Sequence, residues 1–317
     1  MRVIRYLYLL FLMTAVLQWG VGCAVAGQDE NMQEFKPSMA FYYNSDNFIN
    51  YEKRGDGKVP LILLHGFGSS LRNWDDVVDK LADSAAFEDD FTLYALDLKG
   101  AGFSSKPRDG HYAVKDNAEI LTAFLKKLKL RHPVIAGHSL GGGIALYTTV
   151  HMDYNSPYYP SHLILIDAAC YPAQYPFFIK FLRIPIFNKL LLNGLPDDYR
   201  ARRTMELIVA DKKMITPKII HRYAYAYKLK NYDYALIETA KQITPENIDT
   251  LIKGYKNIKS PTTILWGGKD SVLPVSLGEH LQKDIRNSKL IIKYDFAHNL
   301  PEEAPGCVAD AIRNSIK

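Results

Sequence analysis

The sequence has few cysteines and lacks the common motifs that bind metal ions. Its 317 residues include three cysteines, Cys23, Cys170 and Cys307, which form no cluster. There is no H-E-x-x-H motif, and six histidines show no paired ligand spacing: His111, His132, His151, His162, His221 and His280. We therefore expect no metal site. Cys170 and Cys307 are expected to be buried free thiols, although an oxidising compartment would permit a disulfide between them.

The chain also lacks a basic segment with interleaved aromatic residues. Lysine and arginine number 39 against 34 aspartates and glutamates, a formal net charge of +5. This small, dispersed excess indicates no nucleic-acid partner. With 48% hydrophobic and 23% charged residues, the composition is that of a globular protein with enough apolar residues for a sizeable core.

Residues 1–26 predict a targeting segment. Arg2 and Arg5 precede the uncharged, mostly apolar stretch from Tyr6 to Gly22, and Ala24-Val25-Ala26 supplies small residues for cleavage of a signal peptide. Two other interpretations stay open: lipid attachment at Cys23, and an uncleaved membrane anchor. All three place the rest of the chain outside the cytoplasm, as a periplasmic, secreted or membrane-anchored protein.

Apolar runs alternate with helical patterns along much of the chain. The pattern of Leu71–Leu81 and Val114–Leu130 is helical, and the residues from Phe41 to Arg54 predict an early hairpin. Alternation of this kind predicts an α/β fold with a mostly parallel central sheet and helices on both faces. The runs expected to form buried strands are Val59–Leu64, Phe91–Leu98, Pro133–Ala136, Leu163–Ile166, Thr262–Trp266 and Leu290–Tyr294.

Residues 171–260 interrupt the alternation. They contain no buried-strand run and instead show helical patterns rich in tyrosine, phenylalanine, leucine and isoleucine. We interpret them as a helical cap inserted between two parts of the core, residues 41–170 and 261–317. The apolar content of the cap favours an apolar substrate. Tyr223, Tyr225 and Tyr227 do not form one helical stripe, so their spacing leaves open whether they line a pocket.

The most informative stretch is Pro133–Ala145, in which an apolar run ends in Gly-x-Ser-x-Gly at Gly137–Gly141 and a helical pattern follows. This is the strand–turn–helix context in which a serine can act as a nucleophile. The turn is tight enough to require glycines, and it exposes the hydroxyl of Ser139 above the N-terminus of the next helix.

A serine nucleophile needs a base and a carboxylate that orients it. In a strand–turn–helix site of this type the partners follow in the order serine, acid, histidine, and the chain supplies Ser139, Asp270 and His298, each directly after a predicted strand. Asp167 also follows a strand and is the alternative acid. His65 and Asp97 are expected to brace loops, and His138 to pack or hydrogen-bond behind the turn.

These segments resemble the α/β-hydrolase superfamily, in its capped branch of serine hydrolases that includes esterases, lipases and C–C bond hydrolases. The resemblance covers Phe41 to the C-terminus and includes His298 with the following Glu303-Ala304-Pro305. Ala297 stands where the family usually has glycine, a change that affects the loop backbone and not the proton chemistry. The most specific matches are His65–Gly68, Asp97–Ser104, Gly137–Gly142, and Trp266–Asp270 with Pro274.

The resemblance implies hydrolysis through an acyl-enzyme, without a metal or an organic cofactor. The oxyanion hole would consist of two backbone N–H groups, that of Leu140 after the nucleophile and that of Phe67 in the loop after an earlier strand. Gly66 and Gly68 give that loop the freedom to turn.

We expect an exported serine hydrolase that cleaves small-molecule carboxylic esters with an apolar or lipid-like part. A C–C bond hydrolase and an acyltransferase are alternatives on the same triad. From another class, a non-catalytic small-molecule-binding protein stays possible. Dehalogenases and epoxide hydrolases are disfavoured, because those relatives carry a carboxylate at the position of Ser139.

Overall fold

The structure is a computed structural model that describes residues 34–83, 87–172, 177–185, 188, 192 and 194–315. Phe35–Lys317 form one compact unit. The targeting segment predicted for residues 1–26 lies outside the described residues. Within the described ranges, no helix combines the length and the hydropathy needed to cross a membrane.

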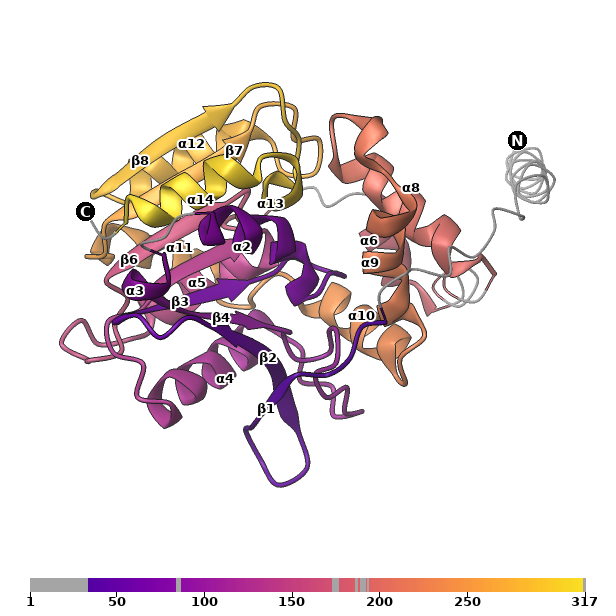
Figure 1. Ribbon diagram of the computed structural model, residues 1–317, viewed down its shortest axis with the longest axis horizontal. Coiled ribbons are helices and arrows are strands. Elements are labelled where there is room, and N and C mark those ends of the chain that lie inside the picture. Colours follow the sequence, from indigo (N-terminus) through magenta and orange to yellow (C-terminus); the bar gives the residue numbers. More distant parts are fainter. Residues whose placement is uncertain are drawn as a thin grey trace. The chain divides into compact units, whose positions relative to one another are not determined.

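An eight-stranded sheet forms the centre of this unit (Figure 1). Its strand order is β1-β2-β4-β3-β5-β6-β7-β8. The pairs β1–β2 and β2–β4 are antiparallel and the other five pairs are parallel, which confirms the mostly parallel sheet and the early hairpin. The strands are β1 (Met39–Tyr42), β2 (Phe48–Arg54), β3 (Val59–Leu64), β4 (Phe91–Leu96), β5 (Val134–His138), β6 (His162–Ile166), β7 (Thr262–Gly267) and β8 (Ser288–Lys293).

Helices cover both faces of the sheet. Successive side chains of a buried strand point to opposite faces, so a strand whose residues are all apolar has to be covered on both sides. In β3, Ile62 and Leu64 join the core beneath α4 and α5, whereas Leu61 and Leu63 join the core beneath α2 and α14. The helices packed against the sheet or at its edges are η2 (Leu71–Trp74), α2 (Asp75–Ala82), α3 (Phe87–Asp90), α4 (Val114–Lys127), α5 (Leu140–Val150), α11 (Ile248–Gly254), η4 (Tyr255–Asn257), α12 (Val275–Asp284), α13 (Leu300–Glu303) and α14 (Pro305–Arg313).

The two cysteines of the described chain belong to different layers. Cys170 is buried in the core that contains α5, whereas Cys307 packs against the core on the opposite face of the sheet. Both are free thiols, as expected, since the sheet lies between them; the expectation that both are buried holds for Cys170 only, because Cys307 is partly exposed.

Every element described between β6 and β7 is helical. Several of these helices lie together beside the sheet, and α8 and α9 share a small apolar core of their own that includes Ala201, Met205, Ile220 and Ala224 (Figure 1). We call α6, α8, η3, α9 and α10 the cap helices; the domain boundaries proposed above stay a prediction. Their bounds are α6 (Phe177–Leu182), α8 (Asp197–Ile208), η3 (Lys212–Met214), α9 (Pro217–Tyr227) and α10 (Tyr232–Gln242).

The helix expected at Leu71–Leu81 begins differently from its prediction. Its first four residues form the 3-10 turn η2, and only then does α2 begin. Two polar side chains hold this start: the hydroxyl of Ser70 accepts from the amide of Arg72, and Asp97 accepts from the amide of Leu71 at 2.8 Å. The periodicity of the apolar residues could not reveal this, because Asp97 lies 26 residues away in sequence.

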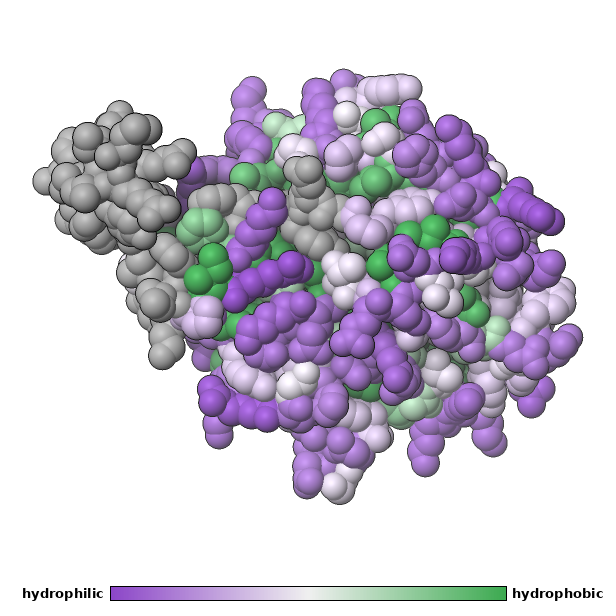
Figure 2. Space-filling model, turned by 180° about the vertical axis from the view of Figure 1, so that it is seen from behind, coloured by the Kyte–Doolittle hydropathy of each residue, from purple (hydrophilic) through white to green (hydrophobic). Residues whose placement is uncertain are grey.

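One face of the molecule is largely hydrophilic, and apolar residues appear there only in small separate areas (Figure 2). Most large apolar side chains of the described chain are buried in the three cores. The apolar residues that matter most for function lie in a cavity above the sheet, at the carboxyl ends of its central strands.

Candidate active site

Ser139 lies at the tip of a sharp turn between β5 and α5. Its backbone has φ +50°, a left-handed conformation that is strained for a residue with a side chain. Its amide donates to the carbonyl of Ile166, and its carbonyl accepts from the amide of Ala169. The glycines on either side are required by space: a Cβ at Gly137 would lie 2.4 Å from the carbonyl oxygen of Gly141, and one at Gly141 would lie 2.2 Å from that of Leu64.

The structure brings Ser139, His298 and Asp270 into one hydrogen-bonded series. His298 Nε2 is 3.1 Å from the hydroxyl oxygen of Ser139, and His298 Nδ1 is 2.7 Å from Asp270 Oδ2. The other carboxylate oxygen of Asp270 accepts from the amides of Val272 and Leu273, at 2.7 and 2.8 Å. The carboxylate is thus held in one orientation, with Oδ2 directed at the imidazole. This arrangement allows proton transfer from Ser139 to His298.

The backbone of His298 is held from two sides. The side chain of His138 donates from Nε2 to the carbonyl oxygen of His298 at 2.8 Å. The amide of His298 donates to the carbonyl of Ile208, the last residue of α8, at 2.9 Å. Since a carbonyl only accepts, the proton of His138 resides on Nε2. Burial lowers the pKa of His138 to about 3, with the charge of His298 as a second cause, so its imidazole stays neutral.

The two amides predicted for an oxyanion hole flank the serine. Leu140 begins α5 directly after Ser139, and Phe67 follows Gly66, where a Cβ would lie 3.2 Å from the Cβ of Ser139. Neither amide has a hydrogen-bond acceptor within the described part of the chain. Both are therefore available to an oxygen atom bound next to the serine.

Asp167, the alternative acid, is occupied elsewhere. Its Oδ1 accepts from the amide of Gly267 at 2.8 Å, and its Oδ2 is buried without a hydrogen-bond partner in the described residues. Burial raises the pKa of Asp167 well above its usual range, and the nearby charge of Asp270 raises it further. The structure therefore pairs His298 with Asp270, whereas Asp167 bonds to the backbone of Gly267.

Asp167→Asn is expected to keep ester hydrolysis within about threefold of the original chain, since the hydrogen bond that orients His298 goes to Asp270 and an amide oxygen can still accept from Gly267. Because the pKa is raised on folding, the folded state binds this proton more tightly than the unfolded chain. The contribution of Asp167 to stability therefore falls as pH rises from about 4 towards its folded pKa. Urea unfolding measures the free energy of unfolding of both proteins at pH 5 and pH 8. The decrease in this free energy from pH 5 to pH 8 should be smaller in Asp167→Asn than in the original chain. An equal loss in both would show that Asp167 carries no raised pKa.

His65 and Asp97 brace the loops around the site, as predicted. His65 Nε2 accepts from the amide of Leu98 at 3.0 Å. The carboxylate of Asp97 is fully buried and accepts from the amides of Leu71 and Phe103 and from the side chain of Asn50. These contacts join the loops after β3 and β4, and so fix the segment that carries Phe67.

A cavity of about 190 Å³ opens onto Ser139 and His298 and is walled by the cap helices. Its two arginines are already paired with acidic residues. Arg200 contacts Asp197 and Asp233, and Arg203 contacts Glu206. Ten of the residues that line the cavity are aliphatic: Ile179, Leu182, Leu192, Leu195, Leu207, Ile208, Leu236, Ile243, Val272 and Leu273.

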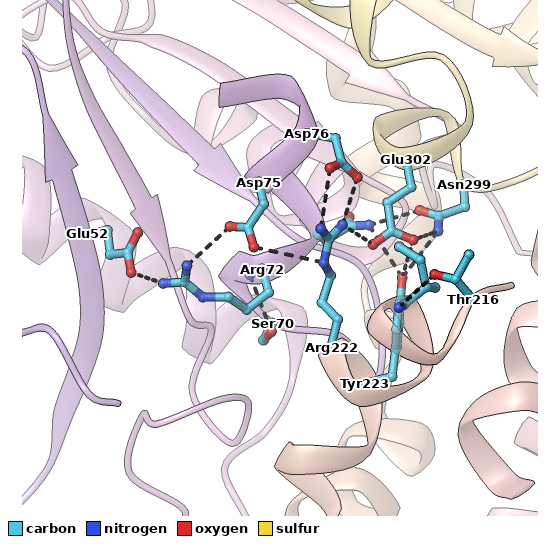
Figure 3. A network of polar contacts seen from close by, with 12 residues as sticks. Glu52, Ser70, Arg72, Asp75, Asp76, Thr216, Arg222, Tyr223, Asn299 and Glu302 are labelled. Atoms are coloured by element: carbon cyan, nitrogen blue, oxygen red, sulfur yellow. Dashed lines mark hydrogen bonds and ion pairs between the residues drawn. The ribbon is translucent and has the colours of Figure 1, made fainter. Parts of the chain in front are cut away.

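The three alternating tyrosines of α9 have different surroundings. Tyr223 and Tyr227 line the cavity, whereas Tyr225 packs against the rings of Phe35 and Phe103. Arg222 directly precedes Tyr223, and no sequence pattern singled it out; it is buried against acidic residues (Figure 3). An arginine in an otherwise amphipathic helix gives no signal of this kind until its partners, far away in sequence, are known.

One group in the described ranges has the ligand types and spacing of a metal site: His138, Asp167 and His298, whose donor atoms lie within 4.8 Å of one another. These donors do not fit a metal ion. His298 directs its nitrogens at Asp270 and Ser139, and His138 Nε2 donates its proton to a carbonyl. A metal would have to displace the hydrogen bonds that align the site.

Comparison with known proteins agrees with the fold. Residues 59–168 match the family model described as the alpha/beta hydrolase fold. Lipase 3 of Moraxella sp. (strain TA144) is 27% identical, over 86% of this chain and 83% of its own length.

Two solved structures share the fold. A putative lipase from Acinetobacter baumannii AYE has a TM-score of 0.72 at 23% identity, over 88% of this chain and 90% of its own. A meta-cleavage product hydrolase from Pseudomonas fluorescens IP01 has a TM-score of 0.69 at 18% identity, over 85% of this chain and 94% of its own. From the family-model match, the sequence relatives and the fold, the chain is an α/β-hydrolase enzyme.

Proposed function

We propose that this enzyme hydrolyses carboxylic esters with an apolar acyl or alcohol part, with Ser139, His298 and Asp270 as its catalytic triad. The observation that carries the proposal is the hydrogen-bonded series from Ser139 through His298 to Asp270 at the mouth of an apolar cavity. The similarity to Lipase 3 of Moraxella and to the Acinetobacter lipase supports ester hydrolysis.

The first half of the reaction forms an acyl-enzyme. His298 Nε2 takes the proton of Ser139 as the serine oxygen attacks the ester carbonyl carbon. Asp270 holds Nδ1–H in place and stabilises the imidazolium that forms. The imidazolium then gives its proton to the leaving alkoxide, and the ester C–O bond breaks. In the second half, His298 takes a proton from water, whose oxygen attacks the acyl carbonyl carbon. The imidazolium then gives this proton to the oxygen of Ser139 as the bond between that oxygen and the acyl carbon breaks, which releases the acid and free Ser139.

The amides of Phe67 and Leu140 stabilise the negative oxygen of each tetrahedral intermediate. They are backbone groups on loops fixed by His65, Asp97 and the start of α5, so little reorganisation is needed when charge develops. Each preorganised donor of this kind lowers the activation barrier by about 3–4 kcal/mol. The N-terminus of α5 adds a smaller favourable field.

The paired arginines of the cavity favour an ester over the substrate of a C–C bond hydrolase. A substrate with a second acidic function needs a cationic or strongly polar partner in the pocket. Arg200 is held by Asp197 and Asp233 and stacks over the ring of Tyr227, and Arg203 is paired with Glu206 and largely exposed to solvent. The charge of Arg200 is therefore not free to receive a carboxylate, whereas an apolar chain fits the aliphatic walls.

A panel of p-nitrophenyl esters tests this substrate class. Each methylene that enters the apolar cavity is worth about 0.8 kcal/mol at most, which corresponds to about a fourfold gain in kcat/KM. We expect kcat/KM to rise from acetate through butyrate until the cavity is filled, and then to level off. A flat series, or faster turnover of a vinylogous diketone with a carboxylate, would contradict the proposed substrate. Steady-state kinetics on the full-length chain provides the measurement.

We further propose that the enzyme acts outside the cytoplasm. This rests on the sequence of residues 1–26 alone, with Arg2, Arg5, the apolar stretch and Ala24-Val25-Ala26. Fractionation of cells that express the full-length chain, with N-terminal sequencing of the product, distinguishes a cleaved signal from a lipid attached at Cys23 or an uncleaved anchor.

A further inference from the structure

A polar network joins the cap helix α9 to the loop that carries His298 (Figure 3). Its centre is Arg222, whose guanidinium binds Asp76 through two hydrogen bonds, of 2.7 and 3.3 Å. The same group donates to Glu302 at 3.1 Å. Asp76 belongs to α2 of the core, and Glu302 lies four residues beyond His298. One cap side chain therefore contacts both the core and the histidine loop.

The network continues to the residue next to His298. The side-chain nitrogen of Asn299 donates to Glu302 at 2.7 Å and to the hydroxyl of Tyr223 at 3.1 Å. Its side-chain oxygen accepts from Asn73 of η2 at 2.9 Å. Asn299 and Glu302 are buried, so solvent does not compete for these bonds. The side chain beside His298 is thus fixed through partners that Arg222 orients.

The cap also binds the backbone of the histidine loop. The carbonyl of Ile208, at the end of α8, accepts from the amides of both His298 and Asn299. The carboxylate of Glu303 accepts from the amide of Ala297 in this loop and from that of Ala210 in the cap. The amides of His298 and Asn299 are therefore bound directly to the end of α8, and the amide of Ala297 is linked through Glu303 to the segment that follows α8.

We propose that Arg222 is a positioning residue for His298: through Glu302 and Asn299 it locks the histidine loop to the cap, so that Nε2 is aligned with Ser139 only while the cap is docked on α2. This inference rests on the proposed function, because it concerns the base of that same reaction. Ser139 and Asp270 are held by core elements, whereas the histidine loop is held both by the core, through His138, and by the cap, through Ile208 and Arg222. A small displacement of Nε2 from the serine lowers the rate steeply, since proton transfer requires hydrogen-bond geometry.

Arg72 provides a matched control within the same network. It is a largely buried arginine that pairs with two acidic residues, Glu52 of β2 and Asp75 of α2. Both partners belong to the core, and Asp75 also lies 3.8 Å from Nε of Arg222, so these ion pairs reach the histidine loop only through Arg222. Arg72→Met removes interactions of the same chemical kind, and it separates a loss of positioning from a general loss of stability.

The full-length chain carrying Arg222→Met is compared with Arg72→Met and the original chain. Removing Arg222 leaves Glu302 able to take up a proton, because burial already raises the pKa of Glu302 to about 7 against the opposing charge of Arg222. With p-nitrophenyl butyrate, kcat per folded molecule should fall between tenfold and a hundredfold in Arg222→Met, with KM within threefold. Arg72→Met should keep kcat within twofold. Arg222→Lys, which keeps the charge but not the forked geometry, should recover part of the loss.

A proton NMR signal gives a second readout that needs no substrate. The Nδ1–H of a histidine bonded to a carboxylate resonates far downfield, and Arg222→Met should shift or broaden that signal whereas Arg72→Met should not. Equal kcat values in the two methionine variants, or a loss confined to KM, would overturn the proposal, as would an unchanged downfield signal. If Arg222→Met does not fold, Arg222→Lys and Glu302→Gln decide the question by the same two measurements. If the original chain hydrolyses no ester, the proposed function fails while the NMR comparison still tests the positioning.

Discussion

Replacing Ser139 with alanine is expected to lower kcat for ester hydrolysis by about ten-thousandfold or more, because the acyl-enzyme can no longer form. The substitution removes the hydroxyl oxygen of Ser139, which lies 3.1 Å from His298 Nε2. The backbone strain at φ +50° stays, so the fold and its melting temperature should change little. Steady-state kinetics with p-nitrophenyl butyrate, with circular dichroism as the check on folding, measures both quantities.

A serine outside the site provides the control for that experiment. Ser161 lies at the opposite end of the sheet, where its hydroxyl donates to the carbonyl of Pro133. Ser161→Ala should keep the full rate. Turnover in Ser139→Ala within tenfold of the original chain would move the nucleophile to another residue.

Asp270→Asn is expected to lower kcat by about a thousandfold or more, and the structure explains why an isosteric change is so costly. The amides of Val272 and Leu273 both donate to Oδ1, so the oxygen of the new asparagine must occupy that position. Its NH₂ group then faces His298 Nδ1 and donates to it. The imidazole is driven into the tautomer that carries its proton on Nε2, and this tautomer cannot accept the proton of Ser139.

Asp167→Asn is the matched comparison for Asp270→Asn, because both replace a buried carboxyl near His298 with an amide. Only the change at Asp270 should reverse the tautomer, since Asp167 accepts from Gly267 and makes no bond to the ring. Kinetics at pH 8 for both variants gives the ranking. A larger loss at Asp167 than at Asp270 would assign the acid to the end of β6 instead of β7.

The fold and the site geometry were largely accessible from the sequence because local pattern and topology suffice for them. Buried strands appear as apolar runs, and the carboxyl ends of parallel strands meet at one edge of the sheet. Ser139, Asp270 and His298 each follow such a strand, so topology alone predicts that they converge. The glycines at 137 and 141 add a local requirement, since no side chain fits there.

The contacts that hold the site together could not be predicted in this way. The bond from His138 to the carbonyl of His298 spans 160 residues, and the bonds from Arg222 to Asp76 and Glu302 span 146 and 80 residues. Each depends on how the cap helices dock on the sheet, which periodicity does not report. The same limit applied to Asp167, whose distance from the ring of His298 depends on the loop after β8, which carries His298.

The central claim is that Ser139 forms a covalent acyl-enzyme, and a pre-steady-state burst with acyl trapping tests it most directly. Mixing the full-length chain with excess p-nitrophenyl ester should release close to one p-nitrophenol per enzyme before the slower steady state, provided that deacylation limits turnover. Acid quenching and peptide mass spectrometry should then find one acyl group, on the peptide that contains Ser139. An acyl group on any other residue, or turnover that stays complete in Ser139→Ala, would contradict the account.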